Sequence, residues 1–264
     1  MNREIDVLVC TPIHRKGAYV LDKFLSNQRD IQERYPSSGL VLATNESDFV
    51  EEMEGLLLSQ GLSGVALLYK TVKPDYARSR VWNIACGRDA LRKYMLSQTG
   101  ARYMLCLDAD TTYDPHVIGI MLEKIKGYSV AQSGCALRTA GIGLSGTACT
   151  LFTRDILERL EFRCLEFKNG QVMPEDMMLE LDLYRLRGRI KKGFFLSNSH
   201  YRNATEARCI TPRPVGVPRW IANASLVRYM LIRTSILIGC NIPWTLKLFV
   251  NRLPRSRRRH AAVS

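Results

Sequence analysis

The chain has 264 residues, which suits one large α/β domain, or such a domain with a short appendage, and is enough to bury a substantial core. Apolar residues make up 46% of it and charged residues 24%, as in an ordinary globular protein. The eight cysteines form no CxxC pair, so the composition does not support a zinc-finger or redox motif. We expect reduced, buried thiols in a cytoplasmic protein.

The positive charge is concentrated at one end of the chain. The net charge is +13, no acidic residue follows Glu206, and the eleven lysines and arginines beyond it leave only +2 for residues 1–206. A nearly neutral body with a strongly cationic tail predicts an anionic partner for the tail.

The first half of the chain alternates apolar runs of strand length with segments of helical periodicity. The predicted strands cover residues 5–10, 39–43, 65–70 and 103–110, and the predicted helices cover 18–35, 47–60 and 78–98. This alternation predicts a parallel sheet with right-handed crossovers, in which ligands gather at the carboxyl ends of the strands. The polar residues expected to converge there are Thr11, Asn45, Glu46, Asp108 and Asp110.

The second half is less regular. A strand is expected over residues 128–138, followed by a glycine-rich loop that could approach a ligand closely. Residues 174–189 predict a helix that opens with a proline and two acids. The next strand is expected to end at His200.

The C-terminal segment from Trp220 to Val250 is rich in Leu, Ile and Val, but basic residues and Pro243 interrupt it. Its uninterrupted apolar part is too short to predict a membrane span. We predict an interfacial amphipathic segment that, with the arginine cluster of 252–259, docks on an anionic membrane. The alternative is a packed helix pair with a disordered tail.

Asp108 and Asp110 follow a buried apolar strand and are candidate metal ligands. Side chains two residues apart share a face if the strand continues. Two close carboxylates repel each other unless a cation lies between them, and Mg²⁺ or Mn²⁺ suits such oxygen ligands. His200 is a candidate third ligand. The alternatives are a solvated turn for the aspartates and a surface position for the histidine.

Two further pairs of charged residues have both a structural and a functional interpretation. Glu175 and Asp176, at a predicted helix N-terminus, either stabilise the helix dipole or supply a general base that deprotonates an acceptor hydroxyl. Arg78 and Arg80 precede or begin a helix, where a guanidinium could clamp a diphosphate. The alternative for these arginines is a solvated helix face.

The sequence resembles the metal-dependent GT-A glycosyltransferases, in particular glycosyltransferase family 2. Four segments within residues 5–203 carry the resemblance: the opening strand into TPIHRKG, the helix ARSRVWNIACGRDAL, the run LCLDAD followed by TTYDPHVI, and the late pair GTACTLFTRDILERL and PEDMMLELDLYRLRGRI. The chain departs from the family by having T-N-E-S where D-D-G-S is common. It also lacks the Q-x-x-R-W of processive synthases, which implies transfer of a single sugar.

The resemblance implies a role for each candidate residue. It assigns the nucleotide to Thr11, Pro12, Asn45, Glu46, Arg78, Arg80 and Asp108, and the metal to Asp108, Asp110 and His200. It assigns the E-D pair, Glu175 and Asp176, to catalysis and favours Asp176 as the base of an inverting reaction. Some retaining families share the D-x-D and the late histidine, so both stereochemical outcomes stay open.

We therefore predict an α/β protein with a GT-A, mostly parallel sheet flanked by helices and a C-terminal membrane-associating helical extension. Residues 1–205 are predicted to form the catalytic domain, with a nucleotide-binding half at 1–112 and an acceptor half at 113–205. Residues 206–264 are predicted to form the extension. The expected location is the cytoplasmic face of a membrane.

The predicted activity is transfer of one sugar from a UDP- or GDP-sugar, with Mn²⁺ or Mg²⁺, to a glycan, lipid or lipid-linked acceptor. One alternative is a nucleotidyltransferase, although TPIHRKG lacks the glycine density of a phosphate loop. The other is a non-catalytic protein with a nucleic-acid-binding tail. No aromatic residue is interleaved with the arginines of 252–259, so we expect no nucleic-acid partner.

Overall fold

A computed structural model describes residues 5–71, 80–134, 148–210 and 224–242. Within them, a seven-stranded sheet has the order β10-β6-β7-β4-β1-β2-β3. Its strands are β1 (Val7–Pro12), β2 (Ser38–Thr44), β3 (Gly64–Leu68), β4 (Tyr103–Leu107), β6 (Val130–Ser133), β7 (Cys149–Thr153) and β10 (Ile190–Gly193). All pairings are parallel except those of β7, which runs antiparallel to both β4 and β6. The predicted mostly parallel α/β sheet is confirmed.

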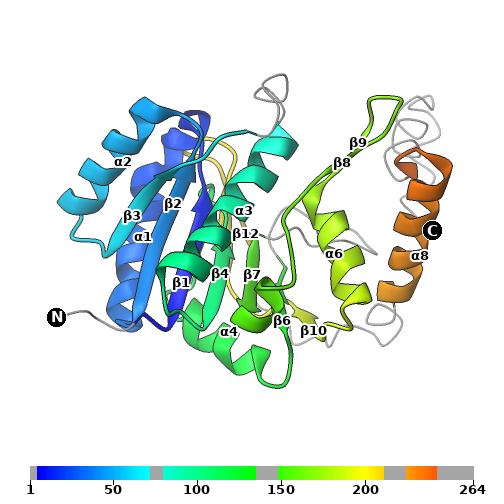
Figure 1. The fold of residues 1–264 in the computed structure, drawn as a ribbon. Helices are drawn as coiled ribbons and strands as arrows, with labels where there is room; N and C mark the ends of the chain where they lie inside the picture. The colour runs from blue at the N-terminus through cyan, green and yellow to red at the C-terminus, as the bar shows by residue number, and fades with distance from the viewer. Residues whose placement is uncertain (1–4, 72–79, 135–147, 211–223, 243–264) are drawn as a thin grey trace, which may run out of the picture.

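Helices cover both faces of this sheet (Figure 1). One face carries α1 (Leu21–Arg34), preceded by the short helix η1 (Arg15–Val20), together with α2 (Ser47–Ser59) and α4 (Val117–Ile125). The other carries α3 (Arg80–Gln98), α5 (Arg154–Leu157) and α6 (Glu175–Arg185). Strand residues alternate between these two layers, so Val7 and Val9 join the first core and Leu8 and Cys10 the second. This double burial explains why the strands read as continuous apolar runs.

A second, three-stranded sheet consists of β5 (Thr111–Tyr113), β11 (Asn198–Tyr201) and β12 (Ala207–Ile210), with β11 in the middle. The prediction of one continuous strand ending at His200 was wrong. The chain instead forms β10 in the main sheet and β11 in the second, because one strand cannot pair with both β6 and β5, which lie in different sheets. The strand predicted over 103–110 also ends early, at Leu107.

Later in the chain than β12, α8 (Ala224–Ile238) lies beside α6 (Figure 1). Its Ile232 is buried against α6 and against the hairpin of β8 (Leu165–Glu166) and β9 (Val172–Met173), and the rings of Tyr184 and Tyr229 stack at 4.1 Å. Part of the predicted extension is therefore packed on the predicted acceptor half. None of the helices in the described part of the chain has the length and apolar character needed to cross a membrane.

Candidate active site

Polar residues meet at the carboxyl ends of β1 and β2, which are neighbouring parallel strands. Thr11 is fully buried, and Asn45 directly follows β2. Among the described residues, the Oγ1 of Thr11 and the Oδ1 of Asn45 are buried without a hydrogen-bond partner. Buried polar atoms are normally satisfied, so these two oxygens indicate a place where a ligand or water completes the structure. Pro12, the last residue of β1, is only partly buried there.

Glu46 has a supporting role at this edge that sequence reasoning missed. Its carboxylate accepts a hydrogen bond of 2.7 Å from the backbone N–H of Arg15 and lies 3.5 Å from the Nδ1 of His14. Its own backbone N–H donates to the Oγ1 of Thr44. Glu46 therefore fixes the loop that follows β1 against the start of α2, beside the predicted nucleoside position.

The second sheet brings His200 to Asp110. β5 begins directly after Asp110, and β11 pairs with it so that His200 lies opposite Thr111. The backbone N–H of Tyr201 also donates to the Asp110 carbonyl at 2.8 Å. As a result the Nε2 of His200 lies 3.3 Å from the Oδ2 of Asp110, and both side chains are largely buried. Burial, together with the neighbouring Asp108 charge, raises the pKa of the Asp110 carboxyl.

Asp108 does not join this pair, contrary to the predicted three-ligand set. Within the described ranges, no three His, Cys, Asp or Glu side chains are grouped to hold a metal. The expectation that both aspartates share a face required the strand to continue, but β4 ends at Leu107 and the chain turns, with the Thr111 N–H bonded to the Asp108 carbonyl. The Oδ1 of Asp108 instead accepts a 2.9 Å hydrogen bond from Arg88.

Asp110 and His200 by themselves suit a divalent cation. Neighbouring ligands at about 2.1 Å and at right angles lie roughly 3 Å apart, close to the separation of these two side-chain atoms. Mg²⁺ commonly takes one or two protein ligands and completes its shell with water and substrate phosphate. The buried Nδ1 of His200 has no hydrogen-bond partner among the described residues, so none of them fixes, through Nδ1, which ring nitrogen carries the proton.

The predicted E-D pair opens α6, and both side chains are buried, Glu175 to 6% exposure and Asp176 to 8%. Glu175 forms an ion pair with the Nη1 of Arg88, the same guanidinium that contacts Asp108. Burial raises the pKa of Glu175, and the Arg88 charge opposes that rise. Arg88 was not among the predicted site residues, because one arginine in a helix gives no sign of partners 20 and 87 positions away in sequence.

The predicted phosphate-clamping arginines are only partly described. Arg78 lies outside the described residues. Arg80 is the exposed first residue of α3. Burial raises the pKa of both Asp110 and Tyr19, and the Arg80 charge opposes that rise at both groups, so Arg80 lies on the Asp110 side of the site.

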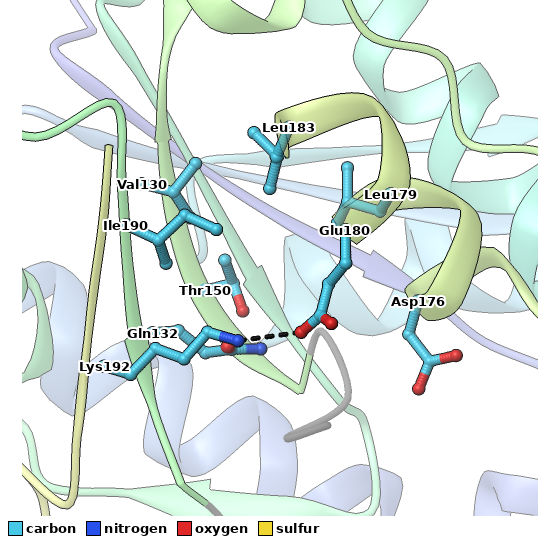
Figure 2. Close-up of a pocket in the computed structure, with 9 residues that line it drawn as sticks. All are labelled: Val130, Gln132, Thr150, Asp176, Leu179, Glu180, Leu183, Ile190 and Lys192. Carbon is cyan, nitrogen blue, oxygen red and sulfur yellow. Dashed lines mark hydrogen bonds and ion pairs between the residues drawn. The ribbon is translucent and has the colours of Figure 1, made fainter. Parts of the chain in front are cut away.

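A small pocket of mixed polar and apolar lining continues from Asp176 beneath α6 (Figure 2). Its lining residues are Val130, Gln132, Thr150, Asp176, Leu179, Glu180, Leu183, Ile190 and Lys192. Asp176 lies at the end opposite Val130 and Ile190, and Lys192 donates to Glu180 at 2.7 Å between them. Asp176, although largely buried, thus borders a small hollow beneath α6.

Comparison with known proteins identifies the fold. No family model and no curated protein matches the sequence. Among solved structures, residues 1–349 of S. aureus TarS align with 88% of this chain and 72% of their own at 14% identity and a TM-score of 0.50. The mannosyltransferase PcManGT from Pyrobaculum calidifontis, solved with GDP-Man and Mn²⁺, aligns with 86% of this chain and 64% of its own at 13% identity and a TM-score of 0.52.

The chain has a GT-A glycosyltransferase fold. The fold that the sequence resemblance implies is therefore confirmed. At identities this low the comparison establishes the fold alone.

Proposed function

We propose that the chain is a metal-dependent glycosyltransferase that moves one sugar from a nucleoside-diphosphate sugar to an acceptor hydroxyl. The observation that carries the proposal is the Asp110–His200 pair, which lies at the same sheet edge as the unpartnered oxygens of Thr11 and Asn45. A cation site for a diphosphate and a polar site for a nucleoside at one edge are the two halves of a donor site. The likeness in fold to a mannosyltransferase bound to GDP-Man and Mn²⁺ supports the same assignment.

In this proposal each side chain has one task. Asp110 and His200 hold Mn²⁺ or Mg²⁺, which when bound would act as a Lewis acid on the leaving diphosphate. Arg80 adds positive charge on the same side, while Thr11, Pro12 and Asn45 contact the nucleoside of a UDP- or GDP-sugar. Asp176 accepts the proton of the acceptor hydroxyl, which attacks the anomeric carbon with inversion. Glu175 is held by Arg88 and is not the base.

A panel of nucleotide sugars with Mn²⁺, read for release of free nucleoside diphosphate, tests the activity. We expect one donor class to be consumed, and consumption to stop with EDTA and with Asp110→Ala. We expect Asp176→Asn to lower kcat by about 10²–10⁴-fold, the usual contribution of a general base. Unchanged activity in EDTA would remove the metal, and near-full activity of Asp176→Asn would remove this base. Pyrophosphate release from a nucleoside triphosphate would favour a nucleotidyltransferase instead.

The acceptor in this proposal is a lipid or lipid-linked glycan at the cytoplasmic face of an anionic membrane. The outer side of α8 supports it, because that side carries large apolar side chains in solvent: Leu226, Met230, Leu231, Leu237 and Ile238. No acidic residue occurs after Glu206, and five of the last 13 residues are arginines that would attract anionic headgroups. These arginines lie outside the described residues.

Co-sedimentation with liposomes that contain anionic lipid tests the membrane contact. Leu237 is 77% exposed on α8, and Leu58 is 83% exposed on α2, so they form a matched pair. We expect Leu237→Glu to weaken binding and Leu58→Glu to leave it unchanged. Deletion of residues 252–264 is expected to remove the preference for anionic over neutral vesicles. Equal liposome binding by the wild type, Leu237→Glu and Leu58→Glu would count against a membrane contact through α8.

A further inference from the structure

Arg88 occupies a central position that the proposed chemistry does not yet use. It lies in α3, immediately after Gly87, whose Cα approaches the end of β1 so closely that an added Cβ would lie 3.0 Å from the Cβ of Pro12. The hydroxyl of Tyr69 donates to the Asn83 carbonyl of the same helix at 2.9 Å. These contacts seat α3 firmly on the sheet edge and give Arg88 a defined starting point.

The Arg88 guanidinium bridges two carboxylates that come from distant parts of the chain. Its Nη2 donates to the Oδ1 of Asp108, in the turn after β4, and its Nη1 pairs with Glu175, the first residue of α6. Arg88 is only 4% exposed, so its pair with Glu175 is shielded from solvent, whereas the Asp108 side chain is partly exposed. The arrangement needs the planar fork of arginine, because a lysine ammonium is a single point of charge and cannot present two diverging N–H groups in fixed directions.

The surrounding charge explains why a cation is needed at this position. Asp108, Asp110, Glu175 and Asp176 place four carboxyl groups near one another, and the Asp108 and Asp176 charges both act on Glu175. Buried charges must be paired, or they cost several kcal/mol. Arg88 is a buried cation that contacts two of these acids. It pairs with Asp108 after β4 and with Glu175 at the start of α6.

We infer that Arg88 is a positioning residue that couples the donor side of the site, through Asp108, to the acceptor side, through Glu175. By holding Glu175 it fixes the first turn of α6 and therefore the direction of the adjacent Asp176 carboxylate. By holding Asp108 it fixes the direction of a carboxylate whose charge also acts on Asp110. The inference rests on the proposed glycosyl transfer for its catalytic consequence, but the coupling itself is a property of the folded chain.

The test combines activity with a double-mutant cycle on Arg88→Lys and Glu175→Gln. We expect each single variant to fold and to lower kcat at least thirtyfold, with the KM for the donor changed much less, since neither residue is assigned to contact the nucleotide. The double variant is expected to be no worse than either single variant, because residues that act as one unit are not additive. Arg92→Lys is the matched control: Arg92 is also a shielded guanidinium of α3, bonded to Asp89, and it should keep activity within about twofold.

The same double-mutant cycle is also measured on the free energy of unfolding. The proposed glycosyltransferase activity and the coupling through Arg88 can then fail separately. If the wild-type chain consumes no nucleotide sugar, the proposed function fails, while non-additive stability effects of Arg88→Lys and Glu175→Gln still support the coupling. If Arg88→Lys keeps more than half of kcat, or if the two substitutions act additively on both kcat and stability, the inference about Arg88 is wrong.

Discussion

Arg154 provides a quantitative test of how α3, the helix that carries Arg88, is held in place. Its guanidinium donates to backbone carbonyls at the C-terminal end of α3 and just beyond, at 2.7 Å to Leu96, 3.1 Å to Thr99 and 3.1 Å to Ala101. Carbonyls at a helix end lack partners within the helix, so a side-chain donor there satisfies several at once. At roughly 1 kcal/mol net for each of these bonds, Arg154→Met should lower the free energy of unfolding by about 3 kcal/mol.

Urea unfolding with a constant m-value is the appropriate assay, because a midpoint shift without a slope change reports stability alone. Arg159, an exposed residue two positions after α5, is the control, and Arg159→Met should change stability by no more than about 0.5 kcal/mol. Arg154→Lys should lie between the wild type and Arg154→Met. A loss below about 1 kcal/mol for Arg154→Met would refute the reasoning, since it would mean that water replaces the guanidinium without cost.

Three further predictions follow from single contacts. Gly87→Ala should cost about 1–3 kcal/mol of stability and reduce activity, because the added Cβ would press on Pro12. Thermal unfolding measures the stability and the donor assay measures the activity. A variant with unchanged stability and activity would contradict the close approach of α3 to β1. Burial raises the pKa of Asp6, but hydrogen bonds, chiefly from Arg102, outweigh it and leave this pKa below the ordinary value, so Asp6 stabilises the fold above about pH 4 and loses that contribution on acidification. The stability difference between wild type and Asp6→Asn should therefore be largest near pH 7 and shrink below pH 4, and a difference independent of pH would exclude this linkage. Thr11→Val should raise the KM for the donor several-fold with little change in stability, because the removed hydroxyl is unpartnered in the described structure; an unchanged KM would remove Thr11 from the nucleoside site.

The sequence predicts a residue's position in the fold where that position follows from the topology of the sheet. Thr11 and Asn45 come directly at the ends of apolar runs, and parallel strands with crossover helices bring those ends to one edge. The acids that open α6 were identified instead from their place at a predicted helix N-terminus and from the family resemblance. Sequence reasoning could not identify the partner of each acid, and it overestimated how far β4 continues toward Asp110.

The sequence by itself determined the alternating order of the elements and the double-sided core, because apolar periodicity is a local property that each segment carries alone. It also determined the acidic residues that follow β4 and the cationic tail. Only the tertiary structure decided that His200 lies beside Asp110, since that contact depends on the register of β11 against β5 across 90 residues of chain. It likewise decided that Arg88 pairs with Asp108, because ion pairs between distant elements are chosen by packing and leave no pattern in the sequence.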